Sequence, residues 1–165
     1  MIYFTPKNIA KNYESVREEL LKNPNITEVT AKSALPTKWY EGNLVTPVDN
    51  PEKEMTMEIC YIKYNYPNVM AIPVVEGSNP FKPNKNPTGE CMINQKAASA
   101  FELTNPVGKQ IKIGDQPFTI VGVLSNANTN SLHLQIDPQV YFPLNNLKEG
   151  HIIMVKTTEN YKDAI

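Results

Sequence analysis

Fourteen prolines are spread along the 165 residues of this chain, and they limit it to short secondary-structure elements. Proline fixes its own backbone, removes a hydrogen-bond donor and disfavours the helical region for the residue before it, so each proline ends or bends an element. Asparagine, another residue that favours turns, is frequent. We therefore expect short helices and strands joined by loops rather than a helical bundle.

The spacing of apolar residues predicts few helices and many strands. Helices are predicted at 5–22 and 95–103, and a third begins within 159–165. Strands are predicted at 26–31, 54–63, 69–75, 91–94, 109–113, 118–124, 139–142 and 152–155, with loop at 36–53. A strand before residue 5 is expected to be missing or nearly so. This order of elements indicates an α+β fold with mixed or antiparallel sheets and few short helices.

Two of the predicted strands carry a specific expectation. The strand at 54–63 alternates between an apolar face (Met55, Met57, Ile59, Tyr61) and a polar face (Glu54, Thr56, Glu58), which is typical of a strand buried on one side. The strands at 109–113 and 118–124 should form a hairpin across Gly114 and Asp115, because glycine supplies the positive φ of a tight turn. The second arm is apolar on both faces, so it should lie centrally in its sheet.

Composition and charge exclude several classes of protein. The formal charge is −1 and Arg17 is the only arginine, so the chain lacks the basic surface that nucleic-acid binding requires. The longest stretch without a charged residue, 116–136, is too polar for a membrane-spanning helix. Gly108 and Lys109 lack the preceding glycine and the following Ser or Thr of a phosphate-binding loop.

No catalytic, cofactor or metal site can be assembled from the motifs. His133 and Asp137 are four residues apart, but two ligands do not make a zinc site, and His151 begins an apolar strand. Two cysteines, Cys60 and Cys91, fall in predicted strands; they could pair if those strands adjoin, or both could be small core residues.

Aromatic pairs in connecting segments are the candidate contact residues. Trp39 and Tyr40 follow Pro36, and Tyr64 and Tyr66 follow the strand at 54–63. Aromatic side chains anchor partners at interfaces, so these four could form a contact surface. Packing onto the domain's own sheet is the alternative.

A run of motifs resembles the MacB-like periplasmic core domain of ABC transporter permeases of the FtsX-like class. In that family an apolar strand is followed by Asn-Glu-x-Ala, a short helix and Asn-Pro-Ile-Gly-Lys before a hairpin, and residues 92–111 are similar, with Gln95 in place of Glu. Residues 33–36, 69–81, 118–124 and 131–138 also resemble family segments in the right order, although Ser78 stands where Arg is usual. Structural turns are expected at Pro36, Gly77, Pro106, Gly108, Gly114 and Gly122.

The resemblance implies a non-catalytic extracytoplasmic domain on the periplasmic face of the bacterial inner membrane, anchored by flanking transmembrane helices outside this chain. ATP would be hydrolysed by a separate ATP-binding domain or subunit, and the domain would couple that hydrolysis to export or mechanical signalling. Implied partners are this subunit, a second permease half or protomer, and an envelope adaptor or substrate. Within the single domain 1–165, residues 1–35 and 148–165 would form a membrane-proximal lobe and 36–147 an inserted distal lobe.

A second reading from the residues alone remains open. The chain could be a free-standing secreted module that binds peptide or sugar through the aromatic loops. It would then show a ligand affinity that is lost on Trp39→Ala. A small hydrolase is disfavoured, because no nucleophile and base can be assembled from the two histidines.

Overall fold

The computed structural model describes residues 2–4, 13–33, 42–83, 87–127, 135–145 and 151–159. The strands are β1 (Ile2–Phe4), β2 (Ile26–Lys32), β3 (Asn43–Pro47), β4 (Met55–Ile62), β5 (Val74–Gly77), β6 (Glu90–Asn94), β7 (Gln110–Ile113), β8 (Gln116–Leu124), β9 (Gln139–Pro143) and β10 (Ile152–Thr157). The helices are α1 (Tyr13–Leu20), α2 (Tyr66–Val69) and α3 (Gln95–Ala100), with a 3-10 turn, η1, at Pro51–Lys53. The α+β class with a mixed sheet and few short helices is confirmed.

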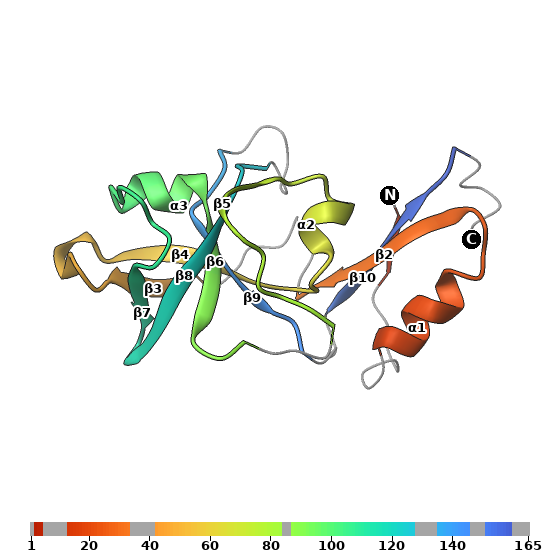
Figure 1. Ribbon diagram of the computed structural model, residues 1–165, viewed down its shortest axis with the longest axis horizontal. Coiled ribbons are helices and arrows are strands. Elements are labelled where there is room, and N and C mark those ends of the chain that lie inside the picture. The colour runs from red at the N-terminus through yellow and green to blue at the C-terminus, as the bar shows by residue number, and fades with distance from the viewer. Residues whose placement is uncertain are drawn as a thin grey trace.

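Six strands close into a barrel, and each of them pairs with two others. Their order around the barrel is β3, β7, β8, β6, β9 and β4, and the β3–β4 pair closes the ring. The β4–β9 and β6–β8 pairs are parallel and the other four are antiparallel. β5 pairs with the end of β8, beyond the part that pairs with β7. Figure 1 shows these strands gathered on the left of the molecule.

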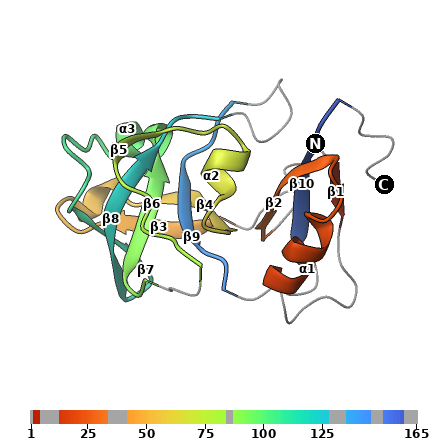
Figure 2. The ribbon, with the colours of Figure 1, turned by 45° about the vertical axis from the view of Figure 1, so that its right-hand side comes forward.

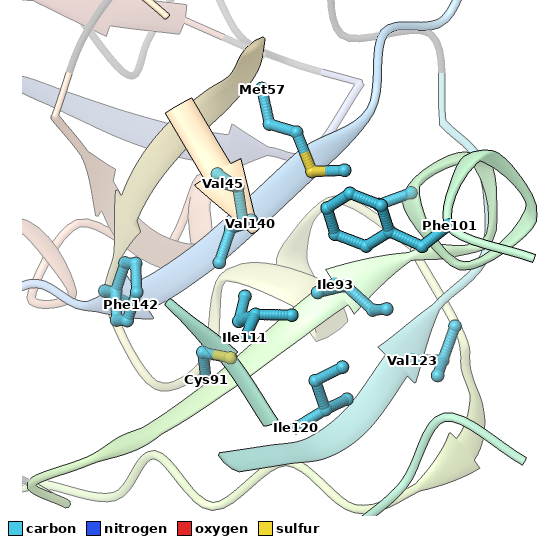
Figure 3. Close-up of a cluster of buried hydrophobic side chains, with 11 residues drawn as sticks. Val45, Met57, Cys91, Ile93, Phe101, Ile111, Ile120, Val123, Val140 and Phe142 are labelled. Carbon is cyan, nitrogen blue, oxygen red and sulfur yellow. The ribbon is translucent and has the colours of Figure 1, made fainter. Parts of the chain in front are cut away.

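The barrel is filled by an apolar core to which all six of its strands and α3 contribute. In Figure 3 the side chains from the surrounding strands and from Phe101 point toward one another. The buried members of this barrel core are Val45, Met57, Cys91, Ile93, Ala97, Phe101, Ile111, Ile120, Val123, Val140 and Phe142. These apolar side chains are held together by burial and close packing, inside the hydrogen-bonded ring of strands.

The remaining strands form a three-stranded antiparallel sheet, β1–β10–β2, that carries α1. Figure 2 brings this sheet forward, with α1 packed against it. A second core fills the space between helix and sheet: Tyr13, Ile26, Val29, Ala31, Leu144, Ile153 and Val155. This sheet meets the barrel strands at a single register pair, Lys32 on β2 with Ile62 on β4.

A third core lies on the opposite face of the three-stranded sheet, where it meets the outside of the barrel. We call it the joint core, and its buried members are Cys60, Ile62, Tyr66, Ile72, Phe81, Met92, Leu124, Tyr141, Ile152 and Met154. Ile152 and Met154 come from β10, whereas Tyr66 belongs to α2, which lies between the barrel and the sheet in Figure 1. The joint core therefore joins both parts of the structure.

Local chemistry explains where α3 and the hairpin form. Asn94 caps α3, because its side-chain oxygen accepts a hydrogen bond from the Ala97 backbone N–H at 2.9 Å. The hairpin of β7 and β8 is confirmed, since Ile113 pairs with Gln116 and only Gly114 and Asp115 lie between them. Gly114 has a φ of +59°, as the tight turn requires. The central place of β8 is also confirmed, because it pairs with β5, β6 and β7.

Two expectations about strands were wrong. The strand expected at 69–75 begins only at Val74, because Val69 is the last residue of helix α2 and β5 is Val74–Gly77. Residues 36–53 were expected to be loop, but β3 lies within them, and Val45 is fully buried and pairs with both Met55 and Ile113. The prolines mark only the end of this strand, at Pro47, and the start of η1. A strand before residue 5 was expected to be missing or nearly so, and the three residues Ile2–Phe4 form a short one that pairs with β10. Pairing across the whole length of the chain stabilises this short piece, and no local pattern reveals it.

The expected faces of β4 are also wrong at Glu58 and beyond Ile59. Tyr61 is exposed, whereas Glu58, Cys60 and Ile62 are buried. The first half of the strand has one face in the barrel core, but the second half has its other face in the joint core. A strand that separates two cores does not keep one polar face.

Candidate functional site at the joint between sheet and barrel

An ion pair is buried where the three-stranded sheet meets the barrel. Lys32 lies opposite Ile62 in the register, and its ammonium is 3.4 Å from Oε1 of Glu58, earlier on β4. The side chains are only 1% and 6% exposed. Removing two charges from water costs desolvation free energy, which is offset only when the pair is close and its remaining polar atoms are hydrogen-bonded. We therefore expect further hydrogen bonds around this pair.

That network crosses the barrel strands. Gln139 on β9 donates its side-chain N–H to Oε2 of Glu58 at 2.5 Å, and its own backbone N–H donates to Asn94 Oδ1 at 3.0 Å. Tyr141 donates its hydroxyl to Gln139 Oε1. Lys32, Glu58, Gln139 and Asn94 therefore form a continuous chain of polar contacts from β2 through β4 and β9 to β6, which we call the joint network.

Backbone bonds beside the joint network extend the contact between β2 and β4. The Ser33 N–H donates to the Tyr61 carbonyl at 2.9 Å, and the Lys63 N–H donates to the Ala31 carbonyl at 3.0 Å. The Asn65 side-chain amide donates to the Val29 carbonyl at 2.8 Å and so ties the start of α2 to β2.

Helix α1 reaches the barrel side through one aromatic ring. The Lys63 ammonium lies 4.4 Å from the centre of the Tyr13 ring and donates to the Asn145 carbonyl at 3.2 Å. Burial lowers the pKa of Lys63, and the nearby Glu14 carboxylate raises it in part. The Tyr13 hydroxyl donates to the Val29 carbonyl at 2.9 Å, so this tyrosine holds both β2 and Lys63.

The tyrosine and cysteine beside the ion pair are protonated at neutral pH. Burial raises the pKa of Tyr66 to about 12; Lys32 opposes the rise, and Cys60 and Glu58 add to it. Burial likewise raises the pKa of the Cys60 thiol, which donates to Glu58 Oε1 at 3.3 Å. A thiol held neutral in this way is a poor nucleophile. The joint therefore has the character of a structural connection rather than a reaction centre.

The cysteines are free and buried in different cores. Cys91 belongs to the barrel core and Cys60 to the joint core, so the core-residue alternative is the one that the structure supports. In the described segments no three His, Cys, Asp or Glu side chains are arranged to hold a metal ion. His151 is half-buried directly before β10, and His133 lies outside the described residues.

Of the four candidate contact aromatics, the structure describes two. Tyr66 is fully buried in the joint core, so it offers no surface to a partner, and it packs on the domain itself. Tyr64 is half-buried beside the same core. Trp39 and Tyr40 lie outside the described residues.

The expected turns fall into three groups. Gly77, Gly108 and Gly114 have positive φ, and Pro106 accepts the Lys109 N–H in the turn before β7. Gly122 is not a turn, because it lies inside β8 opposite Gly77, where a Cβ would stand 2.4 Å from the Ser78 carbonyl oxygen. Close approach of two backbones is the reason for glycine there. Pro36 lies outside the described residues.

Sequence reasoning missed the joint network. Glu58 was assigned to a solvent face, and Lys32 and Gln139 were not singled out. A usable signal was present in the apolar residues Cys60 and Ile62, which share the face of Glu58 and indicate that this face is buried.

The described residues form a closed barrel with an attached three-stranded sheet. Comparison with protein families identifies the family of this chain, because the model of the MacB-like periplasmic core domain matches residues 1–164. The chain belongs to this family, and it is a non-catalytic periplasmic or extracellular domain of an ABC transporter permease. The family resemblance inferred from the motifs is thereby confirmed.

Solved structures share the fold. A permease-protein domain from Porphyromonas gingivalis superposes with a TM-score of 0.65 at 14% identity, covering 92% of this chain and 69% of that one. The periplasmic region of MacB from Actinobacillus actinomycetemcomitans gives 0.59 at 17%, covering 96% and 74%. The extracellular domain of the noncanonic ABC-type transporter YknZ from Gram-positive bacteria gives 0.59 at 19%, covering 98% and 86%.

Two further comparisons complete the description. No curated protein sequence matches the chain. Among the described residues, no helix has both the length and the apolar character needed to cross a membrane.

Proposed function

We propose that this domain is a lever that carries conformational change between the membrane part of the permease and a partner or substrate outside the membrane. The change would originate in ATP hydrolysis by a separate subunit. In this proposal residues 1–35 and 148–165 are the membrane-proximal part, and residues 36–147 are the distal part.

The observation that carries the proposal is the pairing of the first and last strands. β1 and β10 are adjacent and antiparallel, with Ile2 opposite Val155 and Phe4 opposite Ile153. A displacement applied through either of these strands therefore acts on one sheet. The same sheet bonds to the barrel through β2, so motion of the sheet would be passed to the barrel.

The packing on both faces of the three-stranded sheet supports the transmission of motion, because it limits deformation within the sheet. The joint core and the core under α1 lie on the two faces of the three-stranded sheet, and most of their members are nearly inaccessible to solvent. Close-packed interiors deform little, so a sheet enclosed in this way moves as a unit. A lever needs such a rigid sheet where the displacement is applied, which in this proposal is at β1 and β10.

The experiment uses the full-length permease with its ATP-binding subunit in liposomes. Spin labels at Asp115, an exposed residue at the tip of the β7–β8 hairpin, report the distance between barrels of two protomers with and without MgATP. A lever predicts a nucleotide-dependent change in this distance. An unchanged distance during measured ATP hydrolysis would overturn the proposal.

A further inference from the structure

The attachment of the three-stranded sheet to the barrel is narrow for a part that transmits motion. One register pair joins β2 to β4, and the flanking backbone bonds lie within two residues of it. The apolar contacts of the joint core favour contact, but burial is non-directional and does not select one angle between sheet and barrel. Another element is needed to fix that angle.

The joint network has the required directionality. The two oxygens of Glu58 face different elements: Oε1 receives Lys32 from β2, and Oε2 receives Gln139 from β9. Asn94 fixes Gln139 in turn and also donates its amide to the Asp137 carbonyl at 2.8 Å. A change in the angle of β2 would move Lys32 away from a carboxylate that the barrel holds in place.

Buried ion pairs contribute little net stability, because desolvation cancels most of the attraction, but they can select one arrangement over others. From this and from the geometry we infer that the joint network sets the orientation of the three-stranded sheet on the barrel while adding little to the stability of the fold. The inference deepens the proposed lever function, since a lever with an undefined joint angle transmits poorly.

The test removes both charges and keeps the shape. Lys32→Met/Glu58→Gln retains a side-chain carbonyl that can accept the Gln139 amide. The matched control is Lys53→Met/Glu102→Gln, which removes an ion pair of 2.5 Å that is exposed and lies far from the joint, between η1 and the turn after α3. Both variants are made in this 165-residue chain.

Orientation is read by pulsed electron spin resonance between labels at Glu18, exposed on α1, and Asp115, exposed on the barrel. Cysteines are introduced at these positions for labelling. The native thiols do not compete, because both are buried and burial raises the pKa of Cys91 to about 12. Amide exchange at Ser33 and Lys63 reports the same joint from the backbone side.

The double variant at the joint is expected to unfold at nearly the parent urea concentration. Its distance distribution should broaden or gain a second distance, and exchange at Ser33 and Lys63 should rise by about tenfold or more. The control should reproduce the parent in all three measurements.

Two outcomes overturn the inference. One is a distance distribution and exchange rates that match the parent, which would show that the apolar contacts and the remaining hydrogen bonds across the joint fix the angle without the network. The other is a large loss of stability or failure to fold, which would make the network a stability element. Neither depends on ATP or on transport, so failure here is distinguishable from failure of the lever proposal.

Discussion

The barrel core and the joint are both buried, but they are held by different forces. The barrel core is a set of apolar side chains inside a closed ring of strands, so every one of its six strands is paired on both sides. The joint combines apolar packing with a buried ion pair, and one register pair connects its strands.

This contrast indicates that the barrel core provides stability, whereas the polar contacts at the joint set the orientation of the sheet on the barrel. A closed ring has one geometry once its strands pair, so strand pairing and apolar packing are sufficient there. An open connection between a sheet and a barrel has many geometries of similar burial, and directional polar contacts can select one of them.

Ile93→Ala should be the most damaging single change. Ile93 is fully buried in the barrel core, and its truncation removes apolar contacts and leaves a cavity. We expect a loss of about 3–4 kcal/mol in the free energy of unfolding, measured with urea. Leu44→Ala, at an exposed residue of β3, is the control and should change the value by less than about 0.5 kcal/mol. Equal effects at the two positions would contradict the assignment of the core.

Lys32→Ala should cost about 3 kcal/mol, because it leaves the carboxylate of Glu58 buried without its ammonium partner. The double variant Lys32→Met/Glu58→Gln should recover most of this loss in the same urea titration. If the single and double variants were equally unstable, the ion pair would be a source of net stability, and the contrast with the barrel core would fail.

Gly77→Ala should destabilise the attachment of β5 to β8. Gly77 has a φ of +70°, and an added Cβ would stand 2.3 Å from the Val121 carbonyl oxygen. We expect a loss of about 2 kcal/mol in urea unfolding. Gly114→Ala has a similar φ of +59° but open space around the Cβ, so it should cost only about 1 kcal/mol. A reversed order would show that backbone crowding at β8 is unimportant.

Tyr66→Phe should stabilise the protein slightly, by about 1 kcal/mol at pH 7, because the buried Tyr66 hydroxyl has no hydrogen-bond partner among the residues that the structure describes. The advantage should grow at high pH. The pKa of Tyr66 is raised from 10.0 to about 12, so above pH 10 the unfolded chain loses a proton that the folded chain retains, and the parent is destabilised.

The measurement for Tyr66 is urea unfolding of parent and variant at pH 7, 9 and 11. Between pH 9 and 11 the difference in unfolding free energy should increase by about 1 kcal/mol. The other tyrosines are common to both proteins and cancel in this difference. A constant difference across the range would mean that the hydroxyl is accessible to water.

Local patterns predicted most of the strands that form the barrel. Gly114 specified the hairpin, and the apolar faces of 118–124 specified a central strand. β3 was missed because Val45 is buried by strands from both sides, although Leu44 is the only other apolar residue among Asn43, Leu44, Thr46 and Pro47, and it is exposed. At the joint, Cys60 and Ile62 indicate that the face of Glu58 is buried, but only contacts with distant strands show that Lys32 and Gln139 are its partners.

The sequence by itself determined the short elements, the tight turn, the α+β class and the family, because these depend on residues that are close together along the chain. Tertiary structure alone decided the closure of the barrel, the pairing of β1 with β10 and the burial of Lys32 with Glu58. Each of these joins residues far apart in sequence. A charged side chain is buried in a core only where folding brings a partner to it. The residues next to it in the sequence do not identify that partner.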